Sequence, residues 1–317
     1  MKRILVTGGT GTIGSPLVNQ LRTDGHKVFV CDLGHNHSEF GFSITDLNPC
    51  SEYCRCDVGE YRQVERLFTR IWPIDCVYHL AAEFGRWNGE DFYENLWRTN
   101  VVGTKNIIRM QERLGFELVH FSSSEVYGDW ADVMTESVVA ENPIVQMNDY
   151  AMTKRVNEMQ VSNSGKQFNT KSVIIRLFNT YGPGEFYSPY RSVNCRFIYC
   201  ALKGIPWTVH RGHIRTSTFV SDTVRTLANI ADAFRPGSVY NIGGASQHTI
   251  EQLSDIVIAA TGANPSLAEF EDSEAMTTTA KLVDCSKAEA ELGHKNTVGL
   301  EEGIKRTSDW MRATYLK

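Results

Sequence analysis

The sequence predicts an α/β protein with a doubly wound parallel sheet and a smaller C-terminal lobe. In the first half of the 317 residues, apolar runs alternate with amphipathic segments. A glycine-rich loop follows the first apolar run, and the composition changes after residue 179. Strands that are buried on both faces have continuous apolar sequences, and strands that alternate with helices pair in parallel. These observations together indicate a sheet covered by helices on both faces.

The predicted elements follow in chain order. Apolar runs predict strands at residues 3–8, 27–32, 76–82, 117–123, 172–179, 207–211 and 239–244. Helical periodicity predicts helices at residues 14–24, 64–71, 92–114, 149–163, 193–203, 218–234, 249–261 and 301–314. The polar segment 33–54 is expected to be a surface loop.

The domain organisation follows from the same pattern. Residues 1–178 are expected to form the first domain. The chain is expected to return to it at about residues 218–244, because the run 239–244 has the composition of a buried strand. Residues 179–217 and 245–317 are expected to form the second lobe. The segment that opens this lobe is rich in Gly, Pro and Tyr, which is typical of a loop.

The composition argues against several classes of protein. The formal net charge is -5, whereas a general nucleic-acid binder needs a basic surface for phosphate contacts. No apolar run reaches the roughly 18 residues that a membrane span needs. The N-terminal apolar run passes straight into glycines, as a first strand does and a signal peptide does not. We therefore expect a cytoplasmic protein without nucleic-acid or membrane partners.

The eight cysteines are scattered along the chain, which argues against a disulfide framework. Cys50, Cys54 and Cys56 lie close together in sequence, but no second cysteine pair or histidine pair completes a set of metal ligands. Reduced thiols without a metal are therefore expected.

The loop TGGTGTIG, with Gly8, Gly11 and Gly14, lies between the first strand and the first helix. In this position glycines let the backbone approach a pyrophosphate, and the helix N-terminus supplies free N–H groups. Asp32 ends the second strand, where a carboxylate can accept hydrogen bonds from ribose hydroxyls and repels a 2′-phosphate. The combination predicts NAD rather than NADP, and the alternative for Asp32 is a turn residue. Asp57 follows a candidate third strand and could meet the adenine.

Tyr150 and Lys154 lie one turn apart on the predicted helix 149–163, so they share a face. A nearby ammonium lowers the pKa of a tyrosine from roughly 10. The phenolate could then accept a proton from a substrate hydroxyl while hydride leaves the carbon for NAD. The alternative is a surface Tyr–Lys pair. The cluster HFSSSEVYGD, which places Ser123 at the end of a predicted strand, favours catalysis, and Ser122 is expected to be structural.

These motifs identify a family resemblance. The sequence resembles the extended short-chain dehydrogenase/reductase family and, within it, the nucleotide-sugar epimerases, dehydratases and decarboxylases. The matching motifs occur in the family's order across most of the chain: TGGTGTIG, Asp32, HLAA (79–82), TNVVGT (99–104), SSSEVYGD, YAMTK (150–154), RLFNTYGP (176–183) and RTSTFVSD (215–222). The resemblance implies a Rossmann-type domain that binds NAD and a smaller substrate-binding lobe that holds a nucleotide-diphosphate sugar.

The resemblance also implies residue roles. Catalysis, beginning with transient oxidation of the sugar at C4, is expected of Ser123, Ser124, Glu125, Tyr150 and Lys154. NAD binding is expected of Gly8, Gly11, Thr12, Ile13, Gly14, Asp32, Asp57, Val58, Leu80, Ala81 and Ala82, together with Tyr150 and Lys154. Substrate binding is expected of Glu83, Arg86, Asn179, Arg191 and Arg215, with Arg196 as a further candidate for anion contacts. The guanidinium of Arg215 could grip the diphosphate in a bidentate manner.

The resemblance implies a homodimer as well. The apolar stripes of helices 92–114 and 149–163 could meet their copies across a twofold axis, or they could be buried against the protein's own sheet.

The residues leave the reaction open. Ser124 and Glu125 fit a 4,6-dehydratase or a decarboxylase, because plain 4-epimerases usually carry a small or hydroxyl residue at the second position. Segment 81–97 matches none of these branches, and segment 184–197 lacks the decarboxylase pattern. Glu83 could be a second acid/base group, a ligand of a sugar hydroxyl or an exposed loop residue.

The leading prediction is an NAD-dependent nucleotide-sugar epimerase/dehydratase that works through a 4-keto intermediate. The alternatives are a UDP-glucuronate-type decarboxylase, an NAD-dependent sugar reductase or dehydrogenase, and a non-catalytic protein on the same fold.

Overall fold

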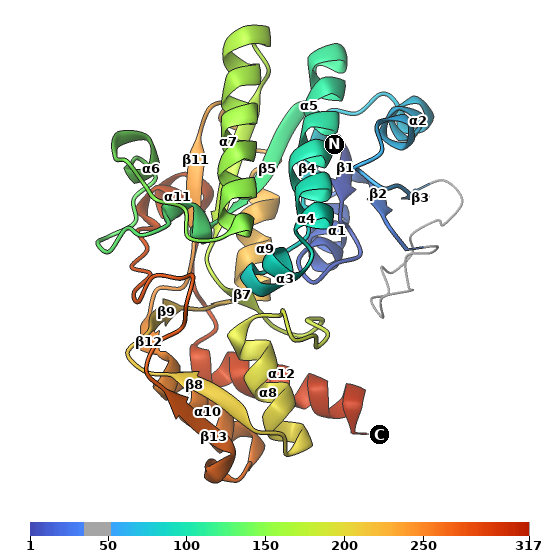
Figure 1. The fold of residues 1–317 in the computed structure, drawn as a ribbon. Helices are drawn as coiled ribbons and strands as arrows, with labels where there is room; N and C mark the ends of the chain where they lie inside the picture. The colour runs from blue at the N-terminus through green and yellow to red at the C-terminus, as the bar shows by residue number, and fades with distance from the viewer. Residues whose placement is uncertain (35–51, 317) are drawn as a thin grey trace.

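A parallel sheet forms the larger part of the protein, which a computed structural model describes for residues 1–34 and 52–316 (Figure 1). Within these residues the sheet has seven strands in the order β11-β6-β5-β4-β1-β2-β3, all parallel. The strands are β1 (Arg3–Thr7), β2 (Lys27–Asp32), β3 (Tyr53–Arg55), β4 (Cys76–His79), β5 (Glu117–Ser123), β6 (Ser172–Leu177) and β11 (Val239–Ile242). The predicted α/β fold with a Rossmann-type sheet is confirmed.

Helices cover both faces of the sheet, because the apolar side chains of each strand alternate between two cores. Ile4 and Val6 of β1 pack with α1 (Gly14–Thr23) and α9 (Val220–Asn229). Leu5 of the same strand faces the opposite core. There α2 (Tyr61–Ile71), α5 (Gly103–Leu114) and α7 (Asp149–Phe168) contribute their buried faces. This two-sided burial explains the continuous apolar runs.

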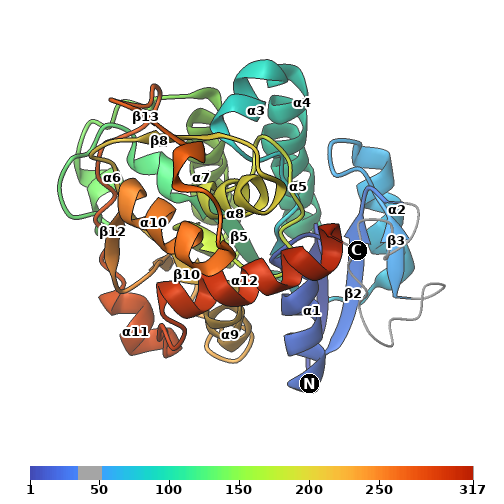
Figure 2. The same cartoon turned by 90° about the horizontal axis from the view of Figure 1, so that it is seen from below.

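The smaller part lies below the carboxyl ends of the strands in Figure 1 and is seen from below in Figure 2. Its helices are α8 (Val193–Lys203), α10 (Ile250–Thr261) and α12 (Leu300–Tyr315), which pack against one another. Two small sheets join β8 (Trp207–His210) to β13 (Ala268–Glu271) and β9 (Ile214–Thr216) to β12 (Gln247–Thr249). A third joins β7 (Thr180–Tyr181) to β10 (Thr218–Phe219).

The remaining described elements are short. They are α3 (Arg86–Asp91), α4 (Tyr93–Trp97), a π-helical turn (Arg98–Val102), a 3-10 turn (Ser124–Tyr127), α6 (Val138–Glu141), a second 3-10 turn (Pro265–Leu267) and α11 (Ser286–Leu292). The sequence-based division places α11 in the second lobe, but this helix packs against β11 and α9 of the larger part.

The predicted helix 92–114 is divided by the π-helical turn. Within this turn the side chain of Asn100 accepts a hydrogen bond from the Glu83 backbone N–H at 2.8 Å and donates to the Glu83 carbonyl at 3.0 Å. A π-turn accommodates one extra residue and often lies at a functional site. Here it fixes the backbone that follows β4.

Other predicted boundaries also differ from the structure, most by a few residues. The predicted helix 218–234 begins only at Val220, because Thr218 and Phe219 pair with β7. The strand β3 overlaps the predicted loop 33–54, whose residues 35–51, including Cys50, lie outside the described part of the chain.

Candidate active site

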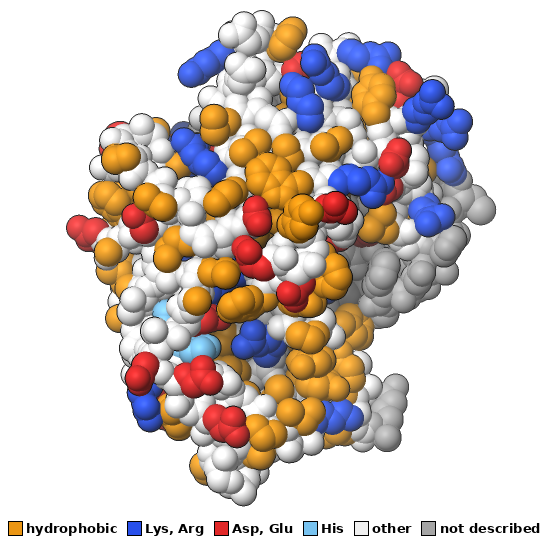
Figure 3. Space-filling model, in the orientation of Figure 1, with side chains coloured by type: hydrophobic (Ala, Val, Ile, Leu, Met, Phe, Trp, Pro, Cys, Tyr) orange, Lys and Arg blue, Asp and Glu red, His pale blue; other side chains and the backbone are white. Residues whose placement is uncertain are grey.

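A cavity of about 490 Å³ lies between the carboxyl ends of the sheet strands and the smaller part. Every residue that the sequence analysis assigned to catalysis, NAD or substrate lines this cavity. Figure 3 shows basic and histidine side chains where the two parts of the molecule meet. In parallel α/β sheets, ligands bind outside the carboxyl ends of the strands, so the cavity is in the expected place.

The glycine loop brings the backbone of the first β–α turn against β4. Gly8 has a φ of +67°, and a Cβ there would lie 2.7 Å from the Ala81 backbone nitrogen. A Cβ on Gly14 would lie 2.2 Å from the Gly8 carbonyl oxygen. Helix α1 begins without a side-chain cap, and its first residue, Gly14, lines the cavity. These features fit a pyrophosphate, as the prediction of NAD requires.

The carboxylate of Asp32 also holds the glycine loop. It accepts hydrogen bonds from the backbone N–H and the hydroxyl of Thr10, at 3.0 and 2.6 Å, and from the Leu33 N–H at 2.8 Å. The remaining acceptor capacity of the two oxygens is available for ribose hydroxyls.

We expect Asp32→Ala to weaken NAD binding by roughly 10- to 100-fold, because a hydrogen bond to a charged group contributes about 1.5–3 kcal/mol. NADP binding should be weakened less, because the repulsion of the 2′-phosphate disappears. Calorimetric titration with both dinucleotides measures the effect. Thr10→Val is the matched control, because it removes a loop bond and keeps the carboxylate. Unchanged NAD affinity in Asp32→Ala would contradict this role.

Asp57 lines the cavity, but its carboxylate is engaged within the protein. Oδ1 accepts the Gly59 N–H at 2.9 Å, and Oδ2 accepts Arg98 Nη2 at 2.6 Å. The expected contact of Asp57 with the adenine therefore stays a prediction. The bonds in the structure show that this carboxylate stabilises the loop around Gly59.

Ser123, Tyr150 and Lys154 come together at the end of β5. Ser123 is the last residue of that strand, and Tyr150 lies in the first turn of α7. The two hydroxyl groups are hydrogen-bonded to each other. Lys154, one turn later, donates from Nζ to the Phe121 carbonyl at 2.9 Å and lies 5.8 Å from the centre of the Tyr150 ring.

The electrostatics of this group differ from the sequence-based expectation. Burial raises the pKa of Tyr150 to about 12, and the charge of Glu125 acts in the same direction, whereas the bond to Ser123 opposes them. Burial lowers the pKa of Lys154 to about 8. The expected lowering of the Tyr150 pKa by Lys154 is thus wrong for this structure, because desolvation dominates and the ammonium is directed at a carbonyl.

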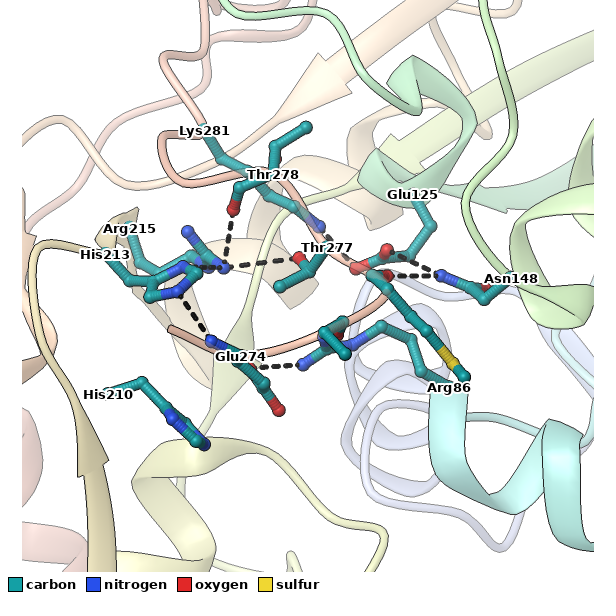
Figure 4. Close-up of polar contacts among 12 residues, drawn as sticks. Arg86, Glu125, Asn148, His210, His213, Arg215, Glu274, Thr277, Thr278 and Lys281 are labelled. Atoms are coloured by element: carbon teal, nitrogen blue, oxygen red, sulfur yellow. Dashed lines mark hydrogen bonds and ion pairs between the residues drawn. The ribbon is translucent and has the colours of Figure 1, made fainter. Parts of the chain in front are cut away.

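Glu125 forms an ion pair with Lys281, a residue that the sequence analysis missed (Figure 4). Lys281 Nζ also lies 3.3 Å from Ser124 Oγ, and Asn148 Nδ2 donates to Glu125 Oε2 at 3.4 Å. Burial favours the neutral carboxyl group, but nearby cations, Lys281 foremost, hold the pKa of Glu125 below its ordinary value. Burial lowers the pKa of Lys281 to about 8, although Glu125 opposes this.

Glu83 and Arg86, two of the predicted substrate residues, form bonds with other side chains of the protein. Glu83 accepts amide hydrogen bonds from Asn95 at 2.8 Å and Asn88 at 3.2 Å, which is the geometry of a fixed loop residue. Arg86 forms an ion pair with Glu274 at 2.9 Å.

Four further predicted residues surround the same cavity. The guanidinium of Arg191 lies 4.2 Å from the centre of the Phe84 ring, and Arg196 lines the cavity nearby. Asn179 has a φ of +28°. Arg215 lines the cavity, but most of its donors bond within the protein.

A buried ion pair stabilises the elements that carry this site. Arg176 donates to both carboxylate oxygens of Glu158 at 2.9 Å, and Ser122 Oγ donates to the same carboxylate at 2.6 Å. Ser122 thus has the structural role that was predicted. The pair joins β5, β6 and α7, which carry the catalytic candidates.

We expect Arg176→Met to lower the free energy of unfolding by about 3–5 kcal/mol, because Glu158 would remain as an unpaired buried charge. Urea denaturation measures this change. Arg155→Ala is the control: Arg155 lies 3.4 Å from Glu158 but is one-third exposed, so its removal should change the stability by about 1 kcal/mol or less. Equal effects of the two substitutions would contradict the assignment.

The comparisons with known proteins agree with this geometry. A Rossmann-type sheet with a glycine loop, an acidic residue after β2 and a Ser–Tyr–Lys group defines a nucleotide-cofactor enzyme. Residues 4–243 match the model of the NAD dependent epimerase/dehydratase family, and the chain belongs to that family. This confirms the predicted family, and the family uses NAD.

Two curated relatives cover nearly the whole chain. UDP-glucuronic acid decarboxylase 6 of Arabidopsis thaliana is 33% identical, over 95% of this chain and 86% of the relative. UDP-glucuronic acid decarboxylase 1 of Xenopus tropicalis is 31% identical, over 98% of this chain and 72% of the relative.

Solved structures show the same fold. The UDP-glucose 4-epimerase of Thermotoga maritima, crystallised with UDP-glucose, has a TM-score of 0.87 and 25% identity, over 99% of this chain and 100% of that chain. MoeE5 in complex with UDP-glucuronic acid and NAD has a TM-score of 0.85 and 27% identity, over 98% of this chain and 99% of that chain. The chain therefore resembles enzymes of nucleotide sugars with different reactions.

Residues 1–34 and 52–316 contain no group of three or more His, Cys, Asp and Glu side chains suited to a metal ion. The same residues form no helix that is long and apolar enough to cross a membrane. Cys50, which the sequence analysis considered with Cys54 and Cys56, lies outside these residues.

Proposed function

We propose that the protein is an NAD-dependent decarboxylase of a nucleotide-linked hexuronic acid, working through a 4-keto intermediate. The observation that carries this proposal is the Glu125–Lys281 ion pair, which lines the same cavity as Tyr150 and Ser123. A plain 4-epimerisation needs no proton donor beside the tyrosine, so this pair indicates chemistry at C5 and C6. The identity to the two UDP-glucuronic acid decarboxylases favours decarboxylation.

In the first half of the reaction, Tyr150 accepts the proton of the C4 hydroxyl, and Ser123 holds that hydroxyl in place. The glycine loop and Asp32 would hold NAD, which would supply the acceptor, and later the donor, of the C4 hydride. Tyr150 accepts the hydroxyl proton as its phenolate, which the raised pKa makes a strong base. The phenol that results can donate a hydrogen bond to the oxygen at C4. Lys154, fixed by the Phe121 carbonyl, supplies a positive charge beside the ring.

In the second half, the new ketone is β to the C6 carboxylate. The C5–C6 bond breaks, carbon dioxide leaves, and the electron pair forms an enolate at C4–C5. C5 must then gain one proton. The Glu125–Lys281 pair provides it, since Lys281 has a pKa of about 8 and releases a proton readily near neutral pH.

Product analysis tests the proposal. The protein is incubated with NAD and a panel of UDP-, dTDP- and GDP-linked hexoses and hexuronates, and the products are followed by mass spectrometry. We expect a hexuronate to lose one carbon dioxide. A nucleotide hexuronate that is epimerised without loss of mass would overturn the decarboxylase proposal, and stoichiometric consumption of NADH with a keto sugar would instead indicate a reductase.

A second candidate is 4,6-dehydration, which the sequence-based prediction named first together with epimerisation. Here Glu125 would take the C5 proton, and Lys281 would give a proton to the departing C6 hydroxyl. The same ion pair favours this reaction, because Ser124, the neighbour of Glu125, is a poor acid. Loss of one water from a nucleotide hexose in the same panel identifies it.

We also propose a homodimer in the cytoplasm. Tyr93, Val102 and Met159, on the faces of α4, the π-turn and α7, have exposed fractions of 56%, 48% and 57%. Figure 3 shows apolar side chains over this region of the surface. Exposed apolar side chains gathered on neighbouring helices are suited to a second copy of the chain. Sedimentation equilibrium of the purified protein measures the association.

A further inference from the structure

Asn148 lies where three parts of the candidate active site meet (Figure 4). It immediately precedes α7, the helix whose first turn carries Tyr150, and it is 3% exposed. The turn that carries Glu125 and the segment that leads to Lys281 both contact its side-chain amide. Asn148 belongs to none of the groups of residues that the sequence predicted for the site, and the proposed mechanism does not use it.

The bonds of this amide explain why the residue is an asparagine. Oδ1 accepts the Ala151 N–H at 2.8 Å and thereby caps α7. Nδ2 therefore faces the two remaining partners, and both are acceptors: Glu125 Oε2 at 3.4 Å and the Met276 carbonyl at 3.1 Å. Serine, threonine and aspartate also cap helices, but none of them combines an acceptor with two N–H donors. The residue type thus indicates a role beyond capping.

The carboxylate of Glu125 is held by a different group at each oxygen. Oε1 pairs with Lys281, and Oε2 accepts the amide of Asn148. The side chains of both partners in the ion pair are largely buried, with exposed fractions of 17% for Glu125 and 6% for Lys281. A carboxylate that is engaged at both oxygens keeps one orientation, which is what a group that transfers a proton to a fixed carbon needs.

The second N–H of the amide holds the segment that leads to Lys281. Met276, whose carbonyl accepts this bond, has a φ of +60°, a left-handed conformation that its surroundings must hold. The later residues of the segment bond to β9. Asn148 therefore bonds directly to Glu125 and to the segment that carries the partner of Glu125.

We propose that Asn148 is a positioning residue: its amide holds the Glu125 carboxylate and the segment of Lys281 at fixed places relative to the helix that carries Tyr150. The two halves of the proposed reaction use different groups, Tyr150 at C4 and the Glu125–Lys281 pair at C5. Both must reach neighbouring carbons of one sugar, so the distance between them has to be fixed. The catalytic consequence rests on the proposed function.

The first test compares Asn148→Ser, Asn148→Ala and the control Asn264→Ser with the wild type. Single turnovers with UDP-glucuronic acid and NAD are quenched with borodeuteride, so that oxidation at C4 and formation of unlabelled product are followed separately. Asn264 also caps a turn, by accepting the Ser266 N–H at 3.0 Å, but it is exposed on the smaller part. Its variant should therefore match the wild type in both halves.

We expect Asn148→Ser to form unlabelled product roughly tenfold more slowly, as when one hydrogen bond to a charged group is lost. Oxidation at C4 should stay within about threefold of the wild type, because serine still caps the helix of Tyr150. Asn148→Ala removes the cap as well and should slow both halves. Equal slowing of both halves in Asn148→Ser would show that Asn148 acts through the helix alone, and wild-type rates in both halves would show that the amide is not needed. Either result would overturn the inference.

A second measurement does not depend on turnover. Crystal structures of the wild type and of Asn148→Ser show the orientation of the Glu125 carboxylate directly. We expect one orientation in the wild type and more than one in the variant, because Oε2 has lost its amide partner. A single unchanged orientation of Glu125 in the variant would overturn the positioning role, whatever reaction the enzyme catalyses. Several orientations together with full activity of Glu125→Gln would keep the positioning role and refute the proposed function instead.

Discussion

Replacement of Tyr150 by phenylalanine should lower turnover by about 10³-fold, within the range of roughly 10²–10⁴ that general acid–base groups contribute. The substitution removes one hydroxyl group, the one that is hydrogen-bonded to Ser123. No oxidised sugar and no final product should accumulate, because the first step is blocked. Quenched-flow sampling with mass spectrometry of the sugar nucleotides measures both species.

Tyr190→Phe is the matched control for this prediction. Tyr190 lines the same cavity, but its hydroxyl donates to Asp91 at 2.7 Å. Its removal should change turnover by less than about tenfold, as expected for a surface hydrogen bond of about 1 kcal/mol. Near-normal turnover of Tyr150→Phe would remove Tyr150 from the mechanism.

Glu125→Gln and Lys281→Met should separate the two halves of the reaction. Both variants keep Tyr150 and Ser123, so the sugar should still be oxidised at C4. Final product should form about 10²- to 10³-fold more slowly, because the proton transfer at C5 lacks its donor pair. Trapping the intermediate with borodeuteride places deuterium at C4 and makes it visible by mass. Equal slowing of oxidation and product formation would argue for a general structural role.

The same pair predicts a pH dependence. The pKa of Lys281 is about 8, so the ammonium form predominates below this pH and is lost above it. Product formation from the keto intermediate should therefore fall as the pH rises through about 8, and Lys281→Met should be slow at every pH. The two halves must be measured separately, because Lys154 also has a pKa of about 8 and affects the oxidation step.

The sequence predicted the parts of the site whose residues lie close together in the chain. The glycine loop lies between a strand and a helix that are consecutive in the chain, so spacing alone places it. Tyr150 and Lys154 share a helix face for the same reason. Ser123 could be placed at the carboxyl end of a strand, and the apolar run 239–244 indicated the return of the chain to the sheet.

The sequence could not predict the parts that depend on contacts between distant segments. Lys281 meets Glu125 across 156 positions, and no motif around it indicates this pairing. The bonds of Arg215 depend on the bridge between Ile214 and Ala280, which forms only when the smaller part is assembled. The pKa of Tyr150 was predicted with the wrong sign, because a single sequence does not show how strongly burial opposes a neighbouring charge.

The most direct test of the account is a single-turnover reaction of Glu125→Gln with UDP-glucuronic acid and NAD, quenched with borodeuteride. The wild type should give a UDP-pentose with loss of carbon dioxide. Because carbon dioxide leaves before C5 gains its proton, the variant should give a UDP-pentose with deuterium at C4, which shows that C4 was oxidised and that the hydride was not yet returned. Formation of UDP-pentose without deuterium by the variant at the wild-type rate would contradict the role of the Glu125–Lys281 pair, and the absence of UDP-pentose in the wild type would contradict the decarboxylase proposal.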